Sequence, residues 1–113
     1  MKVSFEGIGE QVISFSKASG VTKGSLVKLS ANATVAACAS GNKFAGVCIN
    51  DAGSFAEVKT AGYVELGYTG DAPSVGYATL TAASANKVKA DSSGREYLVV
   101  KVDTTAQTVG FMM

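Results

Sequence analysis

The chain has 113 residues, of which 47% are hydrophobic, 8% aromatic and 17% charged, and its formal net charge is +1. This length predicts one domain with a core of modest size. The scattered lysines form no basic patch of the kind that binds nucleic acid, and no apolar run is long enough to span a bilayer. Because the N-terminus lacks the apolar segment of a secretory signal, we expect synthesis and folding in the cytosol.

The charged fraction is lower than the quarter that is usual for globular proteins. One interpretation is that part of the surface is covered by a partner or by copies of the same chain. The other is that serine, threonine and asparagine cover the surface instead. Composition alone leaves both open.

Residues 1–20 differ from the rest, since Gly7, Gly9 and Gly20 interrupt a weak strand signal at 11–16. This segment is either an N-terminal arm that docks on another chain or an edge strand of the domain. The remainder, 21–113, is predicted to form a single β-barrel-like domain.

A plan of glycine, strand, Ala/Asn turn and short strand occurs at 24–35 and again at 76–88, although the identity is too low to define an internal repeat. Between these segments, apolar and polar residues alternate along 44–66. Asn50-Asp51-Ala52-Gly53 and Gly62 break the alternation with residues that favour turns.

The run at 97–103 is the strongest strand signal and is expected to be central, and 108–112 closes the chain as a final strand. No helical periodicity is sustained over ten residues. The sequence therefore predicts an all-β fold, a small β-barrel or sandwich of short antiparallel strands with a less regular N-terminal arm. The predicted core comprises Leu26, Leu29, Val47, Ile49, Val58, Val64, Leu66, Leu80, Leu98, Val100 and Val102.

The two cysteines are predicted to be buried free thiols. A two-residue hairpin turn at Gly41-Asn42 would offset Cys38 from Cys48 by three positions along the ladder. At ~3.3 Å per residue this offset is roughly 10 Å, which is too far for a disulfide.

The residues indicate no catalytic, cofactor or metal site. Histidine is absent, and the carboxylates fall mostly in turns or on polar strand faces. We therefore expect a protein that is not an enzyme. A carbohydrate-binding module that uses Tyr63, Tyr68 and Tyr77 is an alternative, as is a self-assembling structural subunit of a tail or surface layer.

Several segments resemble the small capsid decoration, or cement, proteins of tailed bacteriophages. They are GSLVKL at 24–29, FAGV at 44–47, VKTAGYVEL at 58–66, YLVVKVD at 97–103 and VGF at 109–111. The resemblance covers most of 20–113 and implies a β-barrel-like protein on the outside of the virion capsid. It implies that the protein stabilises the head and often forms trimers, and it transfers no catalytic residue.

On this interpretation the partner is the lattice of the major capsid protein, and a homotrimer is possible. The N-terminal segment provides the candidate contact, in which backbone pairing supplies affinity and apolar side chains fix the register. The candidate contact residues are Val3, Phe5, Ile8, Val12, Ile13 and Phe15.

Overall fold

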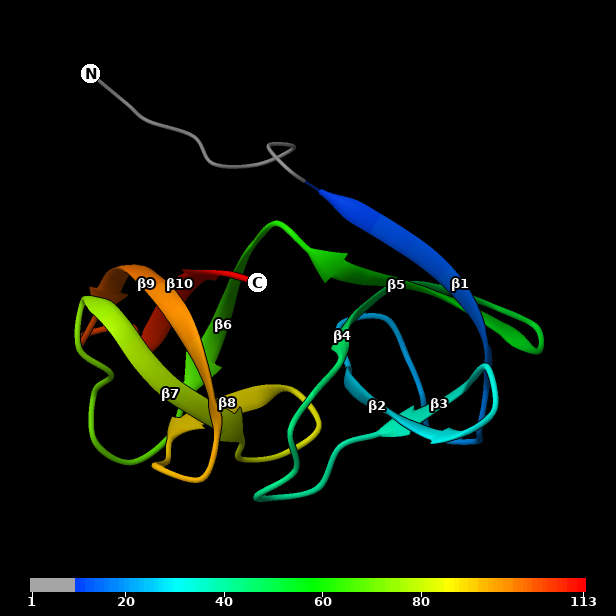
Figure 1. The fold of residues 1–113 in the computed structure, drawn as a ribbon, viewed down its shortest axis with the longest axis horizontal. Coiled ribbons are helices and arrows are strands. Elements are labelled where there is room, and N and C mark those ends of the chain that lie inside the picture. The colour runs from blue at the N-terminus through cyan, green and yellow to red at the C-terminus, as the bar shows by residue number, and fades with distance from the viewer. Residues whose placement is uncertain (1–9) are drawn as a thin grey trace.

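The computed structural model describes residues 10–113, which form ten strands and no helix (Figure 1). The strands are β1 (Gln11–Lys17), β2 (Leu26–Ala31), β3 (Thr34–Ala37), β4 (Gly46–Ala52), β5 (Phe55–Ala61), β6 (Tyr63–Tyr68), β7 (Gly76–Ala82), β8 (Lys87–Ala90), β9 (Arg95–Asp103) and β10 (Thr108–Met112). The predicted all-β class is confirmed.

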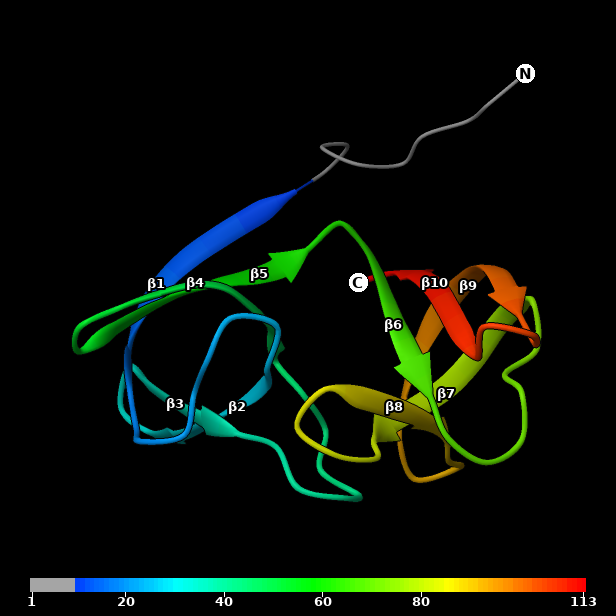
Figure 2. The same cartoon turned by 180° about the vertical axis from the view of Figure 1, so that it is seen from behind.

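The strands form two small closed barrels that lie side by side, as Figures 1 and 2 show from opposite sides. The first barrel has the strand order β1-β3-β2-β4-β5, and the second has the order β6-β8-β7-β9-β10. The prediction of a small barrel is thus confirmed, but the described residues form two barrels, and the first of them includes β1, which precedes residue 21.

The two barrels have the same topology, with β1–β5 equivalent to β6–β10 in order. In each barrel one strand pair is parallel, β1 with β3 and β6 with β8, and the other pairs are antiparallel. Each barrel also has a bulge at the same place, where the ladder skips Ile49 in β4 and Val100 in β9. The chain therefore contains an internal structural repeat. The similar segments at 24–35 and 76–88 were the only sign of this repeat noted in the sequence.

One residue, Gly62, separates β5 from β6 and so connects the two barrels. Its φ of 114° lies in the region that favours glycine. A Cβ atom at this position would lie 3.1 Å from both Glu10 Cα and Lys59 Cε. Conformation and space therefore both require glycine here.

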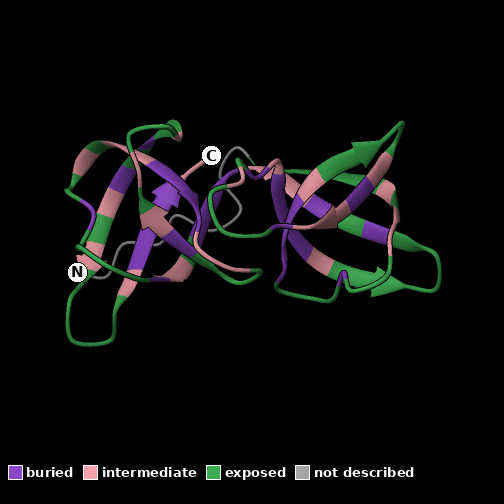
Figure 3. Ribbon diagram, turned by 90° about the horizontal axis from the view of Figure 1, so that it is seen from below, coloured by how far each residue is buried: buried purple, intermediate pink, exposed green. Residues whose placement is uncertain are grey.

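The hydrophobic core has two parts, visible as buried segments in both barrels in Figure 3. The smaller part fills the first barrel and comprises Val21, Val27, Val35, Cys48, Ala56 and Val58. The larger part fills the second barrel but also includes Leu26, Cys38, Phe44 and Val47 from the first half of the chain. The barrels therefore share apolar packing where they meet, and we call this contact the seam.

The predicted core is only partly correct. Five members are buried: Leu26, Val47, Val58, Val64 and Leu80. Leu29 is 57% exposed and Leu98 is 38% exposed, so these two predictions are wrong. Ile49, Leu66, Val100 and Val102 are half-buried.

The error in β9 has a simple cause. Tyr97 and Val99 point into the second barrel, whereas Leu98 faces outward. All four residues at 97–100 are apolar, so the sequence does not show which alternate pair points inward. The prediction chose Leu98 and Val100, and the correct pair is one residue earlier.

The predicted hairpin at Gly41-Asn42 is also wrong. Residues 38–45 form a long connection from β3 to β4, and β2 lies between these two strands. Cys38 and Cys48 are nevertheless buried and free. Burial raises the pKa of both thiols, which keeps them protonated at neutral pH.

We predict that Val99→Asp will lower the free energy of unfolding by several kcal/mol, because it places an unpaired carboxylate in the core. Val99 is 1% exposed, whereas the adjacent bulge residue Val100 is half-buried. Val100→Asp is the matched control and is expected to cost much less. Urea denaturation followed by circular dichroism measures both, and equal losses would contradict the assignment of faces in β9.

Candidate functional site

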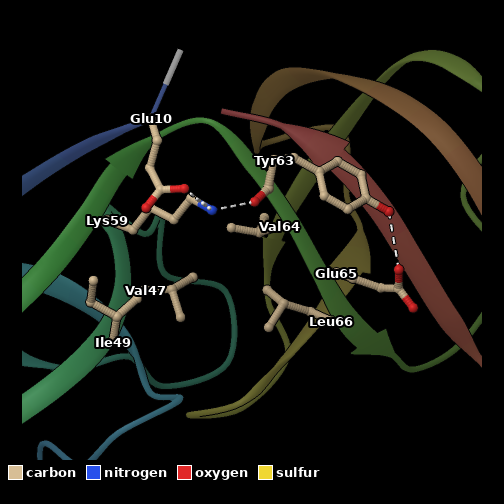
Figure 4. Close-up of a pocket in the computed structure, with 8 residues that line it drawn as sticks. All are labelled: Glu10, Val47, Ile49, Lys59, Tyr63, Val64, Glu65 and Leu66. Carbon is tan, nitrogen blue, oxygen red and sulfur yellow. Dashed lines mark hydrogen bonds and ion pairs between the residues drawn. The ribbon is translucent and has the colours of Figure 1, made fainter. Parts of the chain in front are cut away.

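A groove of about 490 Å³ runs along the seam (Figure 4). One wall is the start of β6, from Tyr63 to Leu66, and the other is formed by Val47 and Ile49 of β4 with Lys59 of β5. Glu10 lies at the end of the groove beside Lys59. We call this feature the seam groove.

The groove exists because the second barrel closes along only part of β6. The parallel pairing of β8 with β6 covers Gly67 and Tyr68, and no described strand of this barrel continues along the rest of that edge. The outer face of the β4–β5 hairpin, where Val47 lies opposite Lys59, stands across from it instead. The β4–β5 hairpin of the first barrel thus lies over the part of β6 that β8 leaves unpaired.

Lys59 is the main polar contact across the seam. Its ammonium group donates a hydrogen bond to the Tyr63 carbonyl oxygen at 2.6 Å and lies 3.3 Å from Glu10 Oε2. Only 12% of the Lys59 side chain is exposed. A charge at this position opposes the pairing of another strand with the edge of β6.

A second polar cluster lies on the outer face of the second barrel. The Tyr63 hydroxyl donates to Glu65 Oε2 at 3.0 Å, and Lys101 Nζ lies 3.0 Å from the same oxygen. The hydrogen bonds from Lys101 and Tyr63 hold the pKa of Glu65 below its usual value. Glu65 is therefore an ionised acceptor at neutral pH and is poorly suited to act as a general acid.

The structure divides the six candidate contact residues into three groups. Val3, Phe5 and Ile8 lie outside the described residues. Val12 and Ile13 in β1 are 41% and 39% exposed, while Phe15 is half-buried and packs against the core of the first barrel.

The segment Gln11–Lys17 is a strand of the first barrel and is not an arm. β1 pairs with β5 along its length, but with β3 only at Ser16 and Lys17. The end of β1 at Ser16 and Lys17 closes the barrel by pairing with β3. No described strand lies beside Gln11–Phe15 on that side, so this part of β1 is an open sheet edge. Val12 and Ile13 lie on this open stretch.

The three tyrosines of the carbohydrate-binding alternative do not form an exposed cluster. Tyr63 is 8% exposed and Tyr68 is 4% exposed, whereas Tyr77 is 71% exposed. Stacking against a sugar ring requires an accessible aromatic face, which only Tyr77 offers among the three.

Sequence reasoning missed an apolar row on the outer face of the second barrel. Tyr77 in β7 lies opposite Leu98 in β9, which in turn lies opposite Met112 in β10. Tyr77 and Leu98 are exposed and Met112 is half-buried. The row was missed because Leu98 was assigned to the core. A signal was available, since a strand that is apolar at four consecutive positions, 97–100, must leave some of these side chains on its outer face.

No known family model matches the chain, and no curated protein matches it either. Within residues 10–113, no helix is long and apolar enough to cross a membrane. The same residues contain no group of three or more histidine, cysteine or carboxylate side chains placed to hold a metal ion.

We predict that Lys59→Met will lower the free energy of unfolding by about 1.5–3 kcal/mol, because the Tyr63 carbonyl loses a charged donor in a largely buried site. Lys101→Met is the control, since it removes a lysine whose ion pair with Glu65 is more than 40% exposed on both sides. Its expected cost is below about 1 kcal/mol. A Lys59→Met cost no larger than that of Lys101→Met in chemical denaturation would show that Lys59 does not stabilise the seam.

Proposed function

We propose that this protein is a non-enzymatic decoration protein that binds the outer surface of an assembled phage capsid and stabilises the shell. The resemblance of 20–113 to capsid decoration proteins suggests this function. The partner is the lattice of the major capsid protein, and the site of action is the exterior of the virion.

The observation that carries the proposal is the set of large apolar side chains left exposed outside a complete core. They are Val12, Ile13, Leu29, Phe55, Val75, Tyr77 and Leu98. Apolar surface that folding does not use is available for a partner. A charge-poor body that offers such surface at several places is suited to a lattice, where each copy has several neighbours.

Contacts with more than one lattice subunit would give avidity without a strong individual contact. Only the assembled shell presents those subunits at the required spacing. We therefore expect binding to expanded heads and no binding to free shell subunits. Val3, Phe5 and Ile8 remain the candidate shell contacts of the N-terminal segment.

Cosedimentation with empty expanded heads tests the proposal. Full-length protein should pellet with heads and stay in the supernatant with free shell subunits. A form that lacks residues 1–9 keeps every described strand, and it should require at least tenfold more protein for the same occupancy. A triple Val3→Ser, Phe5→Ser and Ile8→Ser variant separates the loss of apolar contacts from the loss of chain length.

Two outcomes would contradict parts of this account. If full-length protein fails to pellet with its cognate heads, the decoration function is wrong. If the form without residues 1–9 remains folded and binds equally well, the N-terminal segment is not the anchor. A glycan array and electron microscopy of the isolated protein test the carbohydrate-binding and self-assembling alternatives.

A further inference from the structure

We infer that residues 1–5 pair with the open edge of β1 in the free protein, as a further antiparallel strand of the first barrel. The open edge is the side of Gln11–Phe15 that β3 leaves unpaired. The inference does not rest on the proposed capsid function. Contact of Val3 and Phe5 with a shell would require this strand to leave β1.

The backbone of β1 shows which groups this edge offers. Ser16 donates its N–H to a carbonyl oxygen in the turn between β2 and β3, and Lys17 donates its N–H to one in the turn between β4 and β5. Backbone groups of successive residues in a strand point to opposite sides. Val12 and Ser14 therefore direct their N–H and C=O groups toward the open edge, where no described strand pairs with them. Such an edge is a template for another strand.

The side chains of β1 leave apolar surface at the same place. Ile13 lies opposite Val58 and Phe15 lies opposite Ala56, so both point into the first barrel. Val58 is fully buried, whereas Ile13 is 39% exposed. Among residues 10–113, no strand flanks Ile13 on the open side. An added strand with an apolar side chain beside Ile13 would bury surface that the described strands leave in water.

The occupant that fits this edge is the chain's own segment 1–9, because it leads directly into β1. Glu10 lies at the start of the edge, with its Oε2 atom 3.3 Å from Lys59 Nζ. In 1–5, apolar Met1, Val3 and Phe5 alternate with polar Lys2 and Ser4, which is the period of a strand with one buried face. A segment joined by a short loop has an effective concentration in roughly the millimolar range, which favours it over a separate chain.

The loop fixes the register of the added strand. Gly7-Ile8-Gly9 suits a three-residue hairpin loop, in which a type I turn is followed by a left-handed residue that glycine supplies best. Val3 then lies opposite Ile13 on the inward face. Ser4 lies opposite Val12, whose backbone groups face it. A loop longer by one residue would turn the same apolar residues outward.

One charge pair in this register is unfavourable. Glu6 lies opposite Glu10, and like charges directly opposite each other destabilise a strand pair. The ammonium group of Lys59 beside Glu10 offsets this repulsion. The added strand also covers an edge that would otherwise be free to pair with other chains.

Amide hydrogen exchange measured by NMR tests the pairing. Ser4→Pro removes the N–H that reaches Val12, so the amides of Val12 and Ser14 should exchange at least about tenfold faster than in the wild type. Ser4→Ala keeps this N–H and is the matched control. The amides of Ile13 and Phe15 face β5 and should change little in either variant. If Val12 and Ser14 exchange in the wild type as fast as in Ser4→Pro, the inference is wrong.

Disulfide formation tests the register. Val3→Cys combined with Ile13→Cys places two thiols on directly opposite residues, at a separation suited to a disulfide. The native Cys38 and Cys48 are buried. The bond should form within monomers at least about tenfold faster than in Ser4→Cys combined with Ile13→Cys, because there one thiol points to the other face. Equal rates would overturn the inference, and a bond formed only between copies would assign the edge to a neighbouring chain instead. Neither test depends on whether the protein binds capsids.

Discussion

Phe44 leaves the first barrel on the connection between β3 and β4 and stacks against Tyr97 of the second barrel, with ring centroids 5.2 Å apart. Tyr97 in turn contacts Phe111 at 5.1 Å. The first barrel also contributes Leu26 and Val47 to the core of the second. Because a barrel of about 50 residues buries little surface by itself, we expect the second barrel to depend on this packing for its fold.

Backbone contacts fix the same arrangement. Leu26 N donates to Ala85 O at 2.6 Å, and Ala82 N donates to Asn42 O at 2.9 Å. At the opposite end of the chain, Met113 N donates to Gly62 O at 2.9 Å. Gly62 is the only residue between the barrels. These backbone bonds, together with the Lys59 hydrogen bond, therefore fix the position of one barrel against the other. The same constraint creates the seam groove.

Much of the fold could be predicted from the sequence, because alternation and turn residues mark short strands. The alternation around Val58 correctly identified an inward residue, whereas continuous apolar runs such as 97–100 do not indicate a face. The duplication was missed because barrel closure depends on pairings between distant strands, and these tolerate almost any apolar residue. Val12 and Ile13 were selected from their apolar character, and they lie outside the seam groove. Lys59 was not selected as a site residue, since its role depends on a carbonyl that only the seam places beside it.

The central claim is that the seam makes two small barrels into one cooperative structure. Differential scanning calorimetry tests it most directly, through the ratio of the calorimetric to the van't Hoff enthalpy of unfolding. The account predicts a single transition with a ratio near one for the wild type, and a lower melting temperature for Phe44→Ala. Two separate transitions in the wild type, or a Phe44→Ala variant that melts with the parent, would show that the barrels are stable independently and that the seam is not the basis of the fold.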